Sequence, residues 1–378
     1  MLRNIQYYIE RQLIYKPSAW KFMYRRYCAS ASEDDTMDLQ NVLKKLRKLA
    51  SPSLAGSWDN VGLLVEPSSP HKVNTIFLTN DLTPPVLEEA IAKKSDMIIS
   101  YHPPIFSGMK RLTQKQWKDK IIIKCIENRI AVYSPHTSYD CVEGGVNDWL
   151  ISCFDCKEVE PVEQHEDYIT CHTHQVGFNI PTEFSTSLRE AFKAEQQVKV
   201  TEYRERPDGK HHISVHCTKS TLQRVMCLLQ DKMDSVKNIQ ISELAKAPVL
   251  GYGMGRKAKL SDNITLEEAV KLVKQHLKLD HVRLAKAPGV EKVSSVAVCA
   301  GSGGSVLRNV TADLYVTGEM SHHEVLHAVY NGSSVILCDH SNTERGYLTV
   351  IKTKLQESLD SKTTVVITEV DCDPLKIV

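Results

Sequence analysis

The chain has 378 residues, of which 42% are hydrophobic and 25% are charged, and this composition is typical of a globular protein. Its 47 basic and 46 acidic residues give a net charge of +1, which predicts no direct binding to nucleic acid or to an anionic membrane. No run of 18 apolar residues occurs, so no membrane span is expected. One hydrophobic core rarely supports this length, and the sequence therefore predicts two domains, or one domain with a large insertion.

Residues 1–36 form a basic N-terminal extension with two open interpretations. Up to residue 32 the acidic side chain is Glu10 alone, against six basic ones, Arg3, Arg11, Lys16, Lys21, Arg25 and Arg26. A basic, acid-poor segment that closes on small residues is typical of a cleaved mitochondrial transit peptide. It is equally typical of an unstructured extension on a cytoplasmic protein that also enters the nucleus. The eleven scattered cysteines predict a reducing compartment.

Residues 37–160 are predicted to form a first α/β lobe. An amphipathic helix over 37–50 is followed by apolar segments of strand length that alternate with helical patterns. The predicted strands are 75–79, 96–100 and 130–134, and the predicted helices are 84–94, 115–128 and 145–154. Continuous apolar strands that alternate with amphipathic helices indicate parallel βαβ units.

Residues 161–250 change to a different order of elements. Strands are predicted at 169–180, 198–204, 212–218 and 238–244, with helices at 182–193 and 221–231. Pro207-Asp208-Gly209 is a turn signal between the two middle strands. The order βαββαβ is that of a ferredoxin-like domain, and we expect it to be an insertion.

Residues 251–378 are predicted to form a second α/β lobe after the glycine-rich junction Gly251–Gly255. Strands are expected at 281–284, 293–299, 313–317, 335–338 and 363–368, and helices at 265–277, 306–310, 321–330 and 343–359. The glycine loop 299–305 lacks the third glycine of a dinucleotide site and the Gly-Lys-Ser/Thr of a P-loop. It therefore predicts a tight turn rather than a phosphate site.

Histidines and carboxylates follow three of the predicted strands directly. They are His102 after 96–100, His136 and Asp140 after 130–134, and His340 and Glu344 after 335–338. Ligands gather outside the carboxyl ends of strands in open α/β sheets, so these side chains predict one shared pocket. Mixed imidazole and carboxylate ligands suit Zn, Mn, Fe, Co or Ni.

Five motifs occur in this order in a known family. They are Trp58-Asp59-Asn60-Val61-Gly62-Leu63, Ser100-Tyr101-His102-Pro103-Pro104, His136 to Asp140 with Gly144-Gly145-Val146-Asn147, Val316-Thr317-Gly318-Glu319 with His322-His323, and His340 to Glu344. The chain resembles the NIF-three-like proteins, also called GTP cyclohydrolase 1 type 2 homologues, and most of all their animal members. The resemblance implies a homo-oligomer of two-lobed α/β chains with mostly parallel sheets, an inserted ferredoxin-like domain and a dinuclear metal centre.

Carried over by motif, the implied metal ligands are His102, Asp140, His340 and Glu344. His136 would lie beside them and His323 at the edge, where either can move protons. Bacterial relatives usually have a second histidine where this chain has Tyr101, and a phenol is a poor ligand near neutral pH. The expected content is therefore one or two metal ions per chain.

Two functions remain open at this stage. One is a metal-dependent hydrolase that acts on a nucleotide-like substrate, which the retained ligands favour. The other is a non-catalytic interaction protein that acts as a transcriptional co-repressor or regulator, with transcription-regulatory proteins as partners. Tyr101 favours the second.

Overall fold

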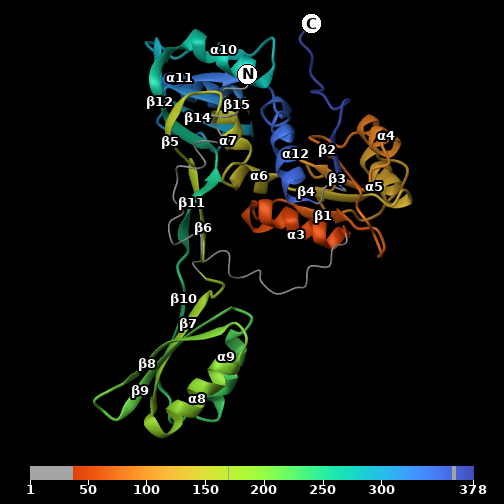
Figure 1. The fold of residues 1–378 in the computed structure, drawn as a ribbon. Coiled ribbons are helices and arrows are strands. Elements are labelled where there is room, and N and C mark those ends of the chain that lie inside the picture. The colour runs from red at the N-terminus through yellow and green to blue at the C-terminus, as the bar shows by residue number, and fades with distance from the viewer. Residues whose placement is uncertain (1–36, 169, 360–362) are drawn as a thin grey trace. The chain divides into compact units, whose positions relative to one another are not determined.

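The computed structural model describes residues 37–168, 170–359 and 363–378 (Figure 1). Residues 38–378 form one compact unit, and the description below concerns this unit. The predicted basic extension, with both of its interpretations, lies outside the described residues.

The first sheet has five strands in the order β1-β4-β3-β2-β17, and its four last-named strands run parallel. The strands are β1 (Gly62–Val65), β2 (Thr75–Thr79), β3 (Met97–Ser100), β4 (Ala131–Ser134) and β17 (Thr364–Ile367). The helices of this region are α3 (Leu39–Leu49), α4 (Pro84–Ala92), α5 (Trp117–Glu127), α6 (Thr137–Cys141) and α7 (Val146–Ile151). Phe77, Ile98 and Val132 pack with apolar residues of α4 and α5, because each strand is apolar on both faces.

The second sheet has six strands in the order β13-β16-β15-β14-β12-β5, of which β14, β15 and β16 are parallel. The strands are β5 (Cys156–Glu160), β12 (Arg256–Thr265), β13 (Arg283–Ala285), β14 (Lys292–Ser302), β15 (Leu314–Glu319) and β16 (Ser334–Leu337). The helices are α10 (Leu266–Leu277), α11 (His322–Tyr330) and α12 (Tyr347–Ser358). α12 follows the second sheet but contacts β2 and β17 of the first.

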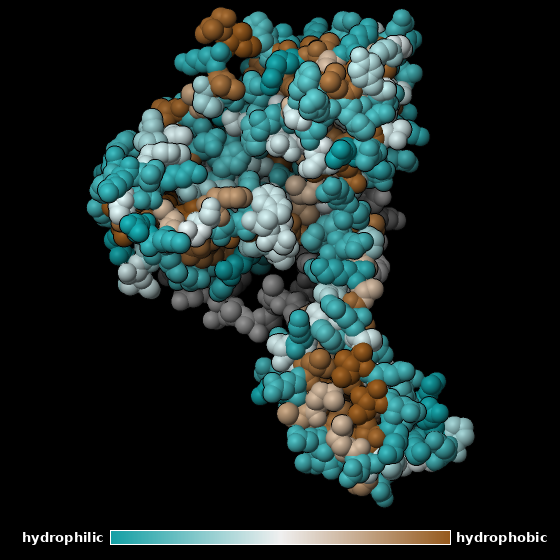
Figure 2. All heavy atoms as spheres, turned by 180° about the vertical axis from the view of Figure 1, so that it is seen from behind, coloured by the Kyte–Doolittle hydropathy of each residue, from teal (hydrophilic) through white to brown (hydrophobic). Residues whose placement is uncertain are grey.

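The insertion has the predicted ferredoxin-like plan. Its antiparallel sheet has the order β10-β7-β9-β8, and its elements are β7 (His174–Pro181), α8 (Thr182–Ala194), β8 (Val198–Glu205), β9 (Lys210–Cys217), α9 (Leu222–Gln230) and β10 (Lys237–Glu243). Phe178, Phe192 and Ile213 lie in its own core. The ribbon of β6 (Glu163–Asp167) and β11 (Ala247–Met254) joins it to the second sheet (Figure 1). Figure 2 shows an apolar area on this domain.

The structure differs from the predicted elements in several places. The helix predicted at 306–310 is wrong, because residues 304–309 form turns and a bend. Most of the glycine-rich junction lies within β11. β17, near the end of the chain, completes the first sheet, and β5 joins the second. Among the described residues, no helix is long and apolar enough to cross a membrane.

A buried ion pair joins the first half of the chain to the second sheet. Arg256 at the start of β12 is 1% exposed, and its Nε and Nη2 each donate to the Asp148 carboxylate of α7 at 2.8 Å. Its Nη1 donates to the carbonyls of Gly253 and Gly255, both at 2.7 Å. The guanidinium therefore fixes α7 against the turn between β11 and β12.

We expect Arg256→Met to lower the free energy of unfolding by about 3 kcal/mol, because Asp148 loses its cationic partner and four backbone carbonyls lose a donor in a mostly buried position. The measurement is urea unfolding followed by circular dichroism. Arg283→Met is the matched control, since Arg283 pairs with Asp339 at 2.7 Å on the surface, and its loss should be below about 1 kcal/mol. Equal losses in the two variants would contradict the role given to Arg256.

Candidate metal centre

Three of the predicted ligands converge at the carboxyl ends of the parallel strands. His102 follows β3, while His340 and Glu344 lie at the two ends of the short 3-10 helix η3 (Ser341–Thr343) after β16. His102 Nε2 lies 3.4 Å from Glu344 Oε2, and His340 Nε2 lies 3.4 Å from Glu344 Oε1. All three donor atoms lie within 4.8 Å of one another, so one metal ion fits between them.

A second carboxylate orients each of the two imidazoles. His102 Nδ1 lies 2.9 Å from Asp81 Oδ1, and His340 Nδ1 lies 2.7 Å from Glu319 Oε1. Each contact leaves Nε2 of the ring facing Glu344. Metal-binding histidines almost always have such a partner on their other nitrogen. The partners of the two imidazoles, and not only the three donor atoms, therefore match those of a metal centre.

Glu344 is charged although it is only 3% exposed. Burial acts to raise its pKa, but the charges and hydrogen bonds of His102 and His340 lower this pKa to about 2. Asn80 Nδ2 also donates to Oε2 at 3.0 Å. Burial acts to lower the pKa of His102, yet Glu344 and Asp81 raise it to about 10. The carboxylates therefore attract positive charge into this pocket.

Gly301 allows the backbone of the second sheet to approach the cluster. A Cβ at this position would lie 2.6 Å from Glu344 Oε1 and 3.0 Å from His340 Nε2. Its φ of +65° is also in the region that favours glycine. Its amide donates to Thr343 Oγ1 at 2.8 Å, which fixes η3. The glycine loop predicted as a tight turn is therefore part of the wall of the site.

Asp140, the fourth implied ligand, does not join this group of donors. It lies in α6, is 8% exposed, and accepts a hydrogen bond from the hydroxyl of Tyr101 on Oδ1. Burial is the largest influence and raises the pKa of Asp140 to about 7. The pKa of Tyr101 is raised well above its usual value, also by burial. The tyrosine thus donates a hydrogen bond to the Asp140 carboxylate.

His136 lies beside the cluster with its ring held in place. Its Nδ1 is 2.7 Å from Asp59 Oδ1, and its ring centroid is 5.4 Å from that of His102. Asp59 Oδ2 accepts from the Thr137 amide at 3.2 Å. The His136 backbone has a φ of +36°, which is costly for a residue with a side chain and is typical of functional sites. The contact with Asp59 therefore engages Nδ1 of the ring.

His323 lies on the first turn of α11 and is exposed. Among the described residues, its ring contacts that of His322 rather than those of the cluster. Sequence reasoning gave no role to Asp59, Asp81 or Glu319. Asp81 and Glu319 stand at strand ends like the predicted ligands, so the same rule applied to every acidic residue would have found them.

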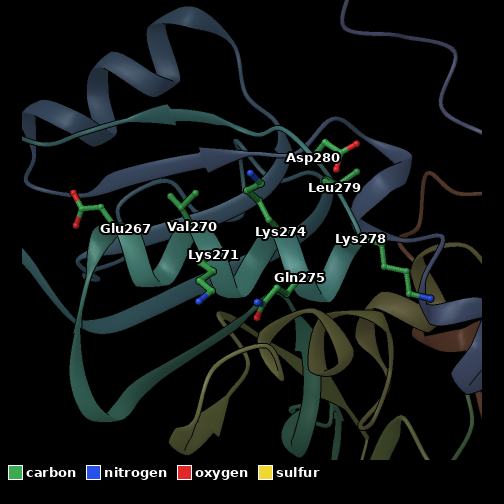
Figure 3. A pocket seen from close by; sticks show the side chains of 8 residues that line it. All are labelled: Glu267, Val270, Lys271, Lys274, Gln275, Lys278, Leu279 and Asp280. Atoms are coloured by element: carbon green, nitrogen blue, oxygen red, sulfur yellow. The ribbon is translucent and has the colours of Figure 1, made fainter. Parts of the chain in front are cut away.

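A concavity of about 500 Å³ lies elsewhere, along α10 (Figure 3). Its lining contains none of the candidate ligands, and Figure 3 shows Lys271 and Lys274 on α10 and Lys278 just after its end. A solvated helix surface accounts for these residues.

Comparison with known proteins places the chain in a family. The family model described as Duf34/NIF3 (NGG1p interacting factor 3) matches residues 37–374. The chain belongs to the Duf34/NIF3 family. This confirms the resemblance found in the sequence and the two-lobed α/β fold with its insertion.

Relatives match the Duf34/NIF3 chain over nearly their whole length. It is 46% identical to the NIF3-like protein 1 of Bos taurus, over 92% of this chain and 94% of that protein. It is 32% identical to the NGG1-interacting factor 3 of Saccharomyces cerevisiae, over 90% and 96%. The crystal structure of Staphylococcus aureus protein SA1388 is similar with a TM-score of 0.72 and 25% identity, over 91% and 99%.

We expect Tyr101→Phe to lower the free energy of unfolding by about 1–2 kcal/mol, because buried Asp140 loses its donor. Tyr139→Phe is the matched control: Tyr139 is also buried, and its hydroxyl has no hydrogen-bond partner among the described residues. The free energy of unfolding of Tyr139→Phe should therefore be nearly that of wild type. Thermal unfolding of both variants measures the difference, and a Tyr139→Phe loss as large as that of Tyr101→Phe would contradict the role of the Tyr101 hydroxyl.

Proposed function

We propose that this protein binds one divalent transition metal through His102, His340 and Glu344. The observation that carries the proposal is the pair of imidazoles, each held on Nδ1 by a carboxylate and turned with Nε2 toward the same buried glutamate. Zn, Mn, Fe, Co and Ni all suit two imidazoles and a carboxylate. A second ion would need Asp140, whose Oδ1 already accepts the Tyr101 hydroxyl and whose side chain is buried, so we expect it to bind more weakly than the first.

The proposed activity is hydrolysis of a nucleotide-like substrate. A metal of this class supplies Lewis-acid activation of water or of a substrate oxygen when it is bound. In this chain His136 is the group best placed to accept and return a proton, since Asp59 fixes its Nδ1 and thereby its orientation. His323 is the weaker candidate because it is exposed on α11. The nucleotide-like substrate is the expectation attached to the family resemblance.

A second candidate function is that of an interaction protein in transcription, acting as a co-repressor or regulator. The yeast relative is named for interaction with NGG1. In this chain, the inserted domain exposes Met233 (44%) and Ile241 (48%), and Figure 2 shows an apolar area on the same domain. Exposed apolar surface of this kind suits a protein partner.

We also propose that the protein forms a homo-oligomer, as the family resemblance implies.

The cellular compartment of the protein depends on whether the N-terminal extension is a cleaved transit peptide or a retained segment. A cleaved extension places the chain in the mitochondrion, and a retained one in the cytoplasm with access to the nucleus. Sequencing the N-terminus of the mature protein from its native cells distinguishes the two, because a retained Met1 excludes import with cleavage.

We expect purified wild type, reconstituted with zinc and dialysed, to hold about one zinc ion per chain by elemental analysis. Glu344→Gln removes the charge between the two imidazoles and should lower the zinc content at least about tenfold. Glu88→Gln is the control, since Glu88 is exposed on α4. Circular dichroism checks that the variants fold. A folded wild type without zinc, or a Glu344→Gln variant with a full complement, would rule out the assignment.

We expect His136→Gln to lower the turnover of nucleoside triphosphates by zinc-loaded protein about 10²–10⁴-fold, because the proton acceptor is lost while the metal ligands remain. His327→Gln, at an exposed position on α11, should leave turnover unchanged. Released phosphate and altered nucleobases are measured together by chromatography. Wild type that holds zinc but turns over no nucleotide would favour the interaction function.

A further inference from the structure

We propose that Trp58 and Phe106 form a binding surface for a planar aromatic or heteroaromatic ring of the substrate, beside the metal ligands. Both side chains are large and apolar, yet they are 62% and 46% exposed. Their ring centroids lie 6.1 Å apart with an angle of 49° between the planes. This proposal rests on the proposed metal function, since it describes the ligand of the same site.

The aromatic pair is continuous with the metal-ligand cluster. The His136 ring lies 6.1 Å from that of Trp58, 6.4 Å from that of Phe106 and 5.4 Å from that of His102. His102 in turn lies 5.2 Å from His340. A ligand whose polar group reaches the cluster can therefore place an attached ring on the pair. Aromatic rings gain from stacked or edge contacts at such separations.

Hydrogen bonds made by neighbouring residues fix the two loops that carry these aromatic side chains. The indole of Trp58 lies so close to Gly56 that a Cβ there would be 2.8 Å from Nε1. The Gly56 amide donates to Thr137 Oγ1 at 3.0 Å, and Asn60 Nδ2 donates to the Ile105 carbonyl at 2.6 Å. The second bond ties the Trp58 loop to the Phe106 loop. Such preorganisation lowers the entropy cost of binding a rigid ring.

The surroundings favour a small ligand over a protein partner. Phe106 also lines a concavity of about 250 Å³, together with Met109 and Trp117. Trp58 is not among its lining residues. Drug-sized ligands occupy pockets of roughly 300–1,000 Å³, so this hollow beside the pair suits a short substituent of the ring. The placement of His136 between the aromatic pair and His102 connects the surface to the site of chemistry rather than to a remote interface.

The test uses three hydroxamates, which share one metal-chelating group and differ in the attached substituent. Acetohydroxamate, benzohydroxamate and cyclohexanecarbohydroxamate are titrated calorimetrically into the zinc-loaded full chain. We expect benzohydroxamate to bind about fivefold or more tightly than the cyclohexane compound, because only the planar ring can stack. Apolar area alone would favour the cyclohexane compound or neither.

Variants assign the effect to the aromatic pair. Trp58→Ala and Phe106→Ala should each bring the ratio of the benzo and cyclohexane affinities toward one, while Trp58→Phe should retain most of it. Thermal unfolding and zinc content confirm that each variant is folded and loaded. Acetohydroxamate binding without any advantage for the planar ring, or an advantage that survives both alanine variants, would overturn the aromatic surface and leave the metal centre standing. A chain that holds no zinc would overturn both.

Discussion

The buried negative charge of Glu344 is the constraint on which the site depends. An ionised carboxylate out of contact with water is stable only when opposite charge and hydrogen bonds surround it. Here His102, His340 and Asn80 supply them, and they come from the ends of strands in two different sheets. Gly301 leaves the space that the carboxylate occupies. The same group that would destabilise a single lobe thus holds the two sheets to one geometry and makes a place for a cation.

Neighbouring contacts keep that geometry fixed. The Gly301 amide and Thr343 hydroxyl hold η3, and Asn147 Oδ1 of α7 accepts from the Ala300 amide at 2.8 Å. Arg256 also holds α7, through Asp148. Metal and catalytic sites require their groups to be placed to within about 0.5 Å, and buried hydrogen bonds of this kind supply such precision. The hydrogen bond with Asp59 fixes the orientation of His136 in the same way.

The sequence predicted much of this arrangement, for a physical reason. Apolar strands followed by imidazoles and carboxylates mark the carboxyl edge of a parallel sheet, so the pattern of residues predicts one pocket for five side chains. Three of the five, His102, His340 and Glu344, form the donor group. No such pattern predicts that β17 pairs with β2, because packing decides which segments distant in sequence become neighbouring strands. The Tyr101–Asp140 hydrogen bond depends on the angle of two buried side chains. The exposure of Trp58 and Phe106 has no periodic signal, since both lie in loops.

X-ray absorption at the zinc edge tests the central assignment most directly, because it reports the atoms around the metal rather than its amount. The zinc-loaded protein should show two imidazole rings and additional oxygen ligands, with one ring lost in a His340→Gln variant. No metal–metal scattering is expected at one zinc ion per chain, since a second ion should bind more weakly beside an Asp140 whose Oδ1 accepts the Tyr101 hydroxyl. A zinc shell without imidazole, or one that does not change in the variant, would contradict a metal centre built on His102, His340 and Glu344.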